Sequence, residues 1–230
     1  FTGNMVSNRL YLNQCNFKFK DISETAGIRA SDRWSTGVAI ADLNEDGWPD
    51  IYVCASTLKS EEKLANMLFV HQGLNEDGIP TFIEMADAYG IADKGFSTNA
   101  AFLDYDRDSD LDLYVLTNRI ETGSADTYRR KRSQGNSPSN DRLYRNDGKG
   151  ENGHPVFSEV SNEAGILHEG YGLGINIADI NQDGWSDIYV SNDYITNDLL
   201  YINNQDGTFT NKIDQYIKHQ SHYSMGNDIG

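Results

Sequence analysis

One acidic segment of nine residues occurs three times in the chain and limits what the chain can fold into. The copies are DLNEDGWPD at 42–50, DYDRDSDLD at 104–112 and DINQDGWSD at 179–187, called loops 1, 2 and 3. Each places oxygen-bearing side chains at positions 1, 3, 5 and 9, between two apolar runs. Calcium takes roughly six to eight oxygen ligands, which a tight loop supplies from alternate side chains and a backbone carbonyl. The spacing therefore predicts three sites for a hard cation.

In loop 1 the predicted side-chain ligands are those of Asp42, Asn44, Asp46 and Asp50, and the position-7 carbonyl comes from Trp48. Position 6 is glycine in loops 1 and 3, which suits a sharp turn because glycine reaches positive φ without a Cβ clash. Loop 2 has Ser109 at position 6 and so departs from the pattern.

The loops have two alternative interpretations. An EF-hand needs a carboxylate at position 12 and a following helix. Position 12 is valine in all three copies, and a β-type run such as Ile51-Tyr52-Val53 follows each loop, so we expect each loop to join two strands. Solvated Asx-type turns are the second alternative, because Asp, Asn and Gly dominate turns without any metal. Three copies with acids at positions 1, 5 and 9 favour the metal.

The composition is that of a globular, acidic protein. The formal charge of the 230 residues is −16, and three divalent cations would reduce it to −10. Nucleic-acid binding is not expected, because phosphate contacts need clustered Lys and Arg. No apolar run approaches the roughly 20 residues of a membrane helix. Cys15 and Cys54 do not amount to a disulfide framework, and whether they pair is left open.

Three landmarks recur in the same order: the acidic loop, an Asn-Arg-Leu-Tyr type run, and a phenylalanine eight residues before a Gly-Ile turn. The loops begin 62 and 75 residues apart. Each repeat is predicted to form four short strands, in the first repeat 37–41, 51–55, 67–70 and 81–85. Four-stranded units are typical of β-propeller blades. We therefore predict an all-β chain that is part of one propeller, with solenoid stacking as the alternative architecture.

The repeat units are predicted at roughly 1–41, 42–103, 104–178 and 179–230, the first and last being partial. Phe157 precedes Asp179 by 22 residues, and the same count from Phe209 reaches one position past the end, with the preceding strand expected at 226–230. Phe1 falls where Val53 falls after loop 1. We therefore expect a longer array with at least five acidic loops.

The second repeat contains an insertion between Arg119 and Asn140 with a basic run, Arg129, Arg130, Lys131 and Arg132. Charge runs are usually solvated loops. The functional alternative is a docking loop for an acidic partner.

The aligned landmarks resemble the FG-GAP/VCBS repeat family of calcium-bearing β-propellers of the integrin-α headpiece type. The strings FTGNMVSNRLYLN, PSNDRLYRND and GYGLGINIADINQDGWSDIYVSNDY look more specifically like the large VCBS repeat surface proteins, often with an ASPIC/UnbV region, of Gram-negative Bacteroidota. The resemblance covers essentially the whole chain. It implies an exported lipoprotein on the outer face of the outer membrane, in some members linked to a SusC/SusD-type nutrient importer.

The resemblance also carries the calcium ligands onto the other two loops. In loop 2 they are Asp104, Asp106, Asp108, the Asp110 carbonyl and Asp112. In loop 3 they are Asp179, Asn181, Asp183, the Trp185 carbonyl and Asp187. Ser109 makes the loop 2 site less certain, although its four ligand carboxylates, against three in each other loop, compensate by charge.

Two classes of function remain. The sequence contains no Gly-rich phosphate loop, nucleophile elbow or HExxH motif, which favours a non-catalytic binding or assembly module for a protein, glycan or peptide partner. The alternative is a carbohydrate-active enzyme, a polysaccharide lyase or glycosidase, because propellers of this repeat class also occur in such proteins.

Overall fold

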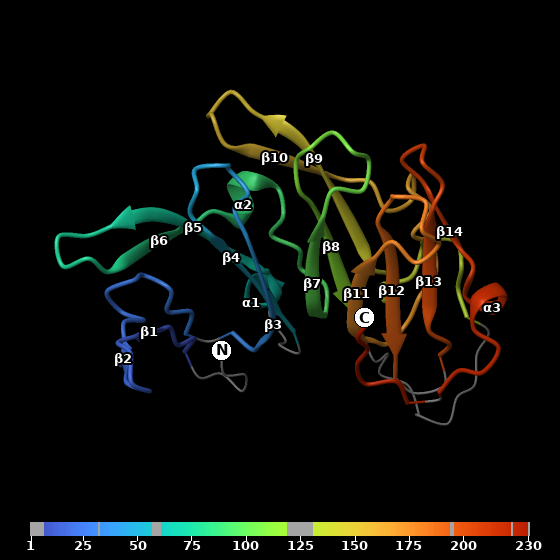
Figure 1. The fold of residues 1–230 in the computed structure, drawn as a ribbon, viewed down its shortest axis with the longest axis horizontal. Helices are drawn as coiled ribbons and strands as arrows, with labels where there is room; N and C mark the ends of the chain where they lie inside the picture. Colours follow the sequence, from blue (N-terminus) through green and yellow to red (C-terminus); the bar gives the residue numbers. More distant parts are fainter. Residues whose placement is uncertain are drawn as a thin grey trace. The chain divides into compact units, whose positions relative to one another are not determined.

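The computed structural model describes residues 7–31, 33–56, 61–118, 131–193, 196–221 and 223–229. These residues form three four-stranded sheets (Figure 1). The first consists of β3 (Ser35–Ala41), β4 (Asp50–Ala55), β5 (Met67–Leu74) and β6 (Pro80–Glu84). The second consists of β7 (Ser97–Leu103), β8 (Asp112–Thr117), β9 (Arg142–Lys149) and β10 (Pro155–Glu159). The third consists of β11 (Gly172–Ala178), β12 (Asp187–Asn192), β13 (Leu199–Asn203) and β14 (Phe209–Asn211).

The smaller elements lie outside these sheets. β1 (Tyr11–Asn13) and β2 (Phe19–Asp21) form a two-stranded sheet. Three single-turn helices are α1 (Glu61–Leu64), α2 (Ala86–Tyr89) and α3 (Ile213–Tyr216). The chain is therefore all-β, as predicted.

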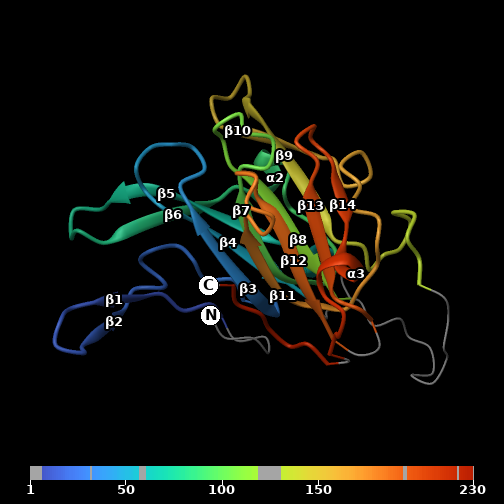
Figure 2. The same cartoon turned by 45° about the vertical axis from the view of Figure 1, so that its right-hand side comes forward.

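In each four-stranded sheet the strands are neighbours in chain order, which is the up-and-down order of a propeller blade (Figure 2). The registers are equivalent: Ile51 pairs with Phe69, Leu113 with Tyr144 and Ile188 with Tyr201. These pairs place an aliphatic side chain of the second strand opposite an aromatic one of the third, and such cross-strand pairs stabilise sheets. The predicted four strands per repeat are confirmed, and the sheets are blades of a partial propeller array.

The described chain divides into two compact units, one of residues 1–97 with 149–156 and the other of residues 98–148 with 157–230. Each unit has its own apolar core. In the first, Ile51, Val53, Met67 and Phe69 are buried with apolar residues of the 22–30 segment. In the second, the core includes Tyr114, Leu143, Ile188 and Tyr201.

A tight turn ending in glycine follows β2 and β10, and each contacts the fourth strand of the next sheet along the chain, β6 and β14 respectively. The Phe82 backbone N–H donates to the Ala26 carbonyl at 2.9 Å, and the Phe209 N–H donates to the Ala164 carbonyl at 2.8 Å. Gly165 has φ +80°, and a Cβ there would lie 2.6 Å from the Phe209 carbonyl oxygen. Gly27 has φ +77° and the same kind of contact with Phe82 at 2.9 Å. Only glycine fits both the backbone angle and the space.

Two expectations about local structure need correction or completion. Residues 226–229 form no strand, so the strand predicted at 226–230 is wrong for that part of it. A first strand pairs with the second strand of its own sheet, and the described residues offer this segment no such partner. Cys15 is exposed and Cys54 is buried, and both are free thiols.

Candidate metal centres

Each acidic loop connects the first and second strands of one sheet, as predicted. Position 1 directly follows the first strand, and position 9 is the first residue of the second strand, namely Asp50, Asp112 and Asp187. The strands thus fix both ends of the loop, and the residues between them turn back sharply.

All three loops have the same backbone form. Position 4 has φ between 60° and 63° in Glu45, Arg107 and Gln182. Position 6 has φ 87° in Gly47, 80° in Ser109 and 88° in Gly184. Ser109 therefore does not change the turn, although a side chain in this region is strained. The departure noted in the sequence costs loop 2 stability rather than shape.

Loops 1 and 3 are closed by the same hydrogen bonds. The Asp42 carboxylate accepts the backbone N–H groups of Asp46 at 3.1 Å and Gly47 at 2.8 Å. The Asn44 amide donates to Asp46 Oδ2 at 3.0 Å, and Asp46 Oδ1 accepts the Trp48 N–H at 2.8 Å.

Loop 3 repeats this pattern at Asp179, Asn181, Asp183, Gly184 and Trp185. Several of these are Asx-type contacts, so both loops are well ordered by their own side chains.

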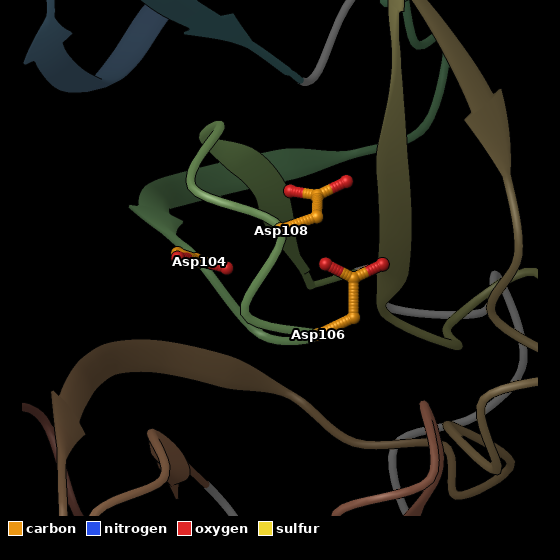
Figure 3. Close-up of side chains that lie close together, drawn as sticks. All are labelled: Asp104, Asp106 and Asp108. Atoms are coloured by element: carbon orange, nitrogen blue, oxygen red, sulfur yellow. The ribbon is translucent and has the colours of Figure 1, made fainter.

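Loop 2 lacks the amide donor, because Asp106 stands where the other loops have asparagine. Carboxylate oxygens of Asp104, Asp106 and Asp108 lie within 4.8 Å of one another (Figure 3). One oxygen each of Asp104, Asp106 and Asp110 is buried without a hydrogen-bond partner among the described residues. Converging, unpartnered carboxylate oxygens are what a hard divalent cation requires.

Position 9 also has a structural role in every loop. Asp112 Oδ2 accepts the Tyr105 N–H at 3.0 Å and Oδ1 accepts the Asn146 N–H from β9 at 2.9 Å. Asp50 makes the same pair of bonds to Leu43 and to His71 of β5, and Asp187 to Ile180 and to Asn203 of β13. These carboxylates are at most 1% exposed. Each therefore ties its loop to the third strand, and a carboxylate has lone pairs left for a further ligand.

The pKa values of the loop carboxyl groups follow from their burial and from the number of hydrogen bonds that they accept. Burial raises the pKa of Asp112 to about 8 and that of Asp50 to about 6, against the N–H donors that lower both. Burial and then the neighbouring Asp108 raise the pKa of Asp110 to about 7, and the same two causes raise that of Asp106. In loop 3 the pKa of Asp183 is lowered, chiefly by the Trp185 N–H. Loop 2 thus concentrates negative charge that lacks internal compensation.

The side chains at position 7 pack outside the loops. Trp48 stacks on His71 with ring centroids 4.6 Å apart. Trp185 lies under the Arg107 guanidinium, whose carbon is 4.6 Å from the ring centroid, and Arg107 also donates to the Gly184 carbonyl. Arg107 therefore joins loop 2 to loop 3. The sequence analysis did not single it out, although an arginine in an acidic loop was a visible signal.

The structure describes only two of the four residues of the basic run. Arg129 and Arg130 lie outside the described residues. Lys131 and Arg132 are exposed, and the Arg132 backbone exchanges hydrogen bonds with Glu169. The docking role of this run stays a prediction.

Comparison with known proteins supports the repeat assignment. Residues 1–53 match the family model described as an FG-GAP-like repeat. The chain is 29% identical over 187 residues to cartilage acidic protein 1 of Mus musculus, an alignment that covers 80% of this chain and 25% of that protein. The chain thus spans about a quarter of the relative's length.

The match to FG-GAP-like repeats agrees with the bladed sheets and suggests a propeller-like binding module. Such repeats typically occur in extracellular domains. None of the helices in the described part of the chain is long and apolar enough to cross a membrane.

Proposed function

We propose that the three acidic loops bind calcium and that the chain is a calcium-stabilised, non-catalytic binding module of an extracellular protein. The observation that carries this proposal is loop 2, where carboxylate oxygens converge without partners on a backbone shared with loops 1 and 3. The predicted ligands in all three loops supply carboxylate, amide and carbonyl oxygens, which suit calcium. The occurrence of calcium in FG-GAP repeats supports the same assignment.

The chain's own residues explain why such a site would stabilise the fold. Asp42, Asp104 and Asp179 directly follow the first strand, and the position-9 carboxylates begin the second strand and accept hydrogen bonds from the third. Side chains that converge on one cation from both ends of a loop would hold these strands together. Binding to the folded state alone stabilises by about 2.7 kcal/mol when free ligand exceeds Kd a hundredfold.

Thermal unfolding in EGTA and in excess calcium tests the proposal. We expect calcium to raise Tm by about 5 to 10 °C for each site occupied a hundredfold above its Kd. Magnesium, which prefers a tighter octahedral shell, is the control and should raise Tm less. An identical melting curve in EGTA and calcium would rule out structural calcium.

Terbium luminescence can resolve the loops, because Trp48 and Trp185 lie at position 7 of loops 1 and 3 and would sensitise a bound lanthanide. Trp48→Phe should remove the loop 1 signal alone. Trp185→Phe should remove the loop 3 signal and also reduce that of loop 2, whose Arg107 stacks on the Trp185 ring. Trp34→Phe, outside all three loops, is the control. Sensitised emission that no position-7 variant reduces would contradict the assignment of these loops.

For the whole protein we propose a surface lipoprotein of the ASPIC/UnbV type, on the outer face of the outer membrane and associated with a SusC/SusD-type importer. The sequence strings that resemble that subgroup support this. Co-purification from native membranes with the full-length protein tests it, with importer subunits as the expected partners. Enrichment of no outer-membrane importer would contradict the association. Cleavage of neutral or acidic glycans by the purified chain would favour the carbohydrate-active alternative.

A further inference from the structure

A cavity of about 440 Å³ lies in the second unit beside loops 2 and 3. Its wall includes Asp106 of loop 2, Trp185 of loop 3 and Glu163 of the turn after β10. The β13–β14 turn contributes Gln205, Asp206 and Thr208, and Tyr105 and Arg145 also line the cavity. The volume is within the range of about 300 to 1,000 Å³ that is usual for ligand pockets.

The charges in this cavity are unequal. Asp106, Glu163 and Asp206 each retain a carboxylate oxygen without a hydrogen-bond partner among the described residues. Arg145 is the cation in the lining, and its guanidinium already bonds Asp147 at 2.7 and 2.8 Å. The carboxylates outnumber the one cation of the lining, so the cavity is electronegative.

Tyr105 supplies a separate sign that the cavity is built for a polar ligand. The residue is 3% exposed, and its hydroxyl has no hydrogen-bond partner within the described part of the chain. A tyrosine hydroxyl can donate and accept, so in the wall of this cavity it can hydrogen-bond a ligand.

Trp185 adds an aromatic surface to the same wall. Its ring already makes a cation–π contact with the Arg107 guanidinium. The indole can therefore contact a cation in this position. Arg107 does not line the cavity, so it does not fill the space.

We propose that this cavity binds a guanidinium or ammonium group on an apolar stem, namely an arginine or lysine side chain of a partner protein. Glu163 and Asp206 pair with the cation, the Tyr105 hydroxyl accepts a hydrogen bond, and Trp185 contacts the stem. Acidic ligands are rejected by Glu163 and Asp206. Asp106 is also a predicted calcium ligand, so recognition of the cation is assigned to Glu163 and Asp206, which belong to no acidic loop.

The test is a titration of the whole chain with three end-capped tripeptides, in which arginine, lysine or glutamate lies between two glycines. It is followed by the three tryptophan indole signals in ¹H–¹⁵N spectra, with Trp185→Phe assigning the relevant one. The arginine and lysine peptides should shift the Trp185 signal and leave those of Trp34 and Trp48 in place. The glutamate peptide should shift none.

Substitutions then locate the site. Glu163→Gln and Asp206→Asn should each weaken the arginine peptide about two- to fivefold, as expected for partly exposed ion pairs. The double variant should weaken it about tenfold or more. Tyr105→Phe keeps the ring and removes only the unpartnered hydroxyl, so it should weaken binding with little change in Tm. Glu151→Gln, an exposed acid on the β9–β10 turn, is the control with the same charge change.

Three results would overturn the proposal. One is an unchanged Trp185 signal at saturating concentrations of both basic peptides. Another is weakening by Glu163→Gln and Asp206→Asn that does not exceed that of Glu151→Gln. The third is a Trp185 shift with a neutral hexose and none with the basic peptides, which would assign the cavity to a sugar.

Discussion

Loops 1 and 3 satisfy their own acids, whereas loop 2 does not, although all three have the same backbone. The difference lies mainly at position 3, where the amides of Asn44 and Asn181 donate to the position-5 carboxylate. Asp106 in loop 2 cannot donate when ionised. Position 6, where the sequences differ more visibly, leaves the φ angle nearly unchanged. Loop 2 keeps the hydrogen bonds from the Ser109 N–H to Asp104 and from the Asp110 N–H to Asp108. Without the amide its acids are paired less completely, so it has more to gain from a cation.

The largest expected loss of stability comes from replacing the position-9 aspartate, which all three loops share. Asp50→Ala, Asp112→Ala and Asp187→Ala each leave two buried N–H groups without an acceptor, at a cost of about 2 to 5 kcal/mol. Urea unfolding in EGTA measures it, with Asp77→Ala in the β5–β6 turn as an exposed control. A much smaller loss for Asp112→Ala than for the other two would show that loop 2 is not anchored in the same way.

The next largest effect is a pH dependence of the free energy of unfolding that arises from loop 2. In EGTA the raised pKa values of Asp110 and Asp112, about 7 and about 8, mean that the folded state holds protons that the unfolded state has released. The free energy of unfolding should therefore fall as pH rises from about 5 to about 8, by up to about 1.4 kcal/mol per pH unit for each proton. Asp110→Asn should flatten the fall near pH 7. A stability that rises over this range would contradict the unpaired carboxylates of loop 2.

An exchange at position 3 should convert one kind of loop into the other. Asp106→Asn removes one charge and restores the amide donor, so in EGTA we expect a gain of about 1 kcal/mol. The reciprocal Asn181→Asp should lose a similar amount, and in calcium both differences should shrink or change sign. If both exchanges raise, or both lower, the free energy of unfolding in EGTA, the amide at position 3 does not explain the difference between the loops.

The smallest effect is at position 6. Ser109→Gly should stabilise loop 2 by about 0.5 to 1 kcal/mol, because Ser109 has φ 80°. Gly47→Ser is the matched reverse change in open space and should cost about the same. Gly184→Ser should cost about the same, because the Arg107 guanidinium 2.9 Å from its Cβ is the end of a flexible side chain and can move. Chemical denaturation in EGTA measures the free energy of unfolding of the three variants. If Ser109→Gly does not increase it, the serine causes no strain in loop 2.

The sequence predicted the strands and the loop positions well, because alternation and the repeated acids are local signals. It could not predict which oxygens already have partners. Asp50, Asp112 and Asp187 look like ligands in the sequence, and their bonds to the third strand come from residues 16 to 34 positions away. The cavity could not be predicted from the sequence either, because Glu163 and Asp206 belong to no motif. Arg107 shows the same limit, because its contact with Trp185 spans two repeats.

The Gly-Ile turn that touches the next repeat's phenylalanine strand has a consequence for how such chains can change length. Each contact joins a turn to the following repeat across a glycine that has no room for a side chain. The interval from phenylalanine to glycine is eight residues after Phe19, Phe82 and Phe157, while the loop-to-loop distance varies from 62 to 75. Extra residues are therefore tolerated in connections such as that between β8 and β9 but not inside this interval. A family built on this contact can diversify its surface without altering how successive repeats join.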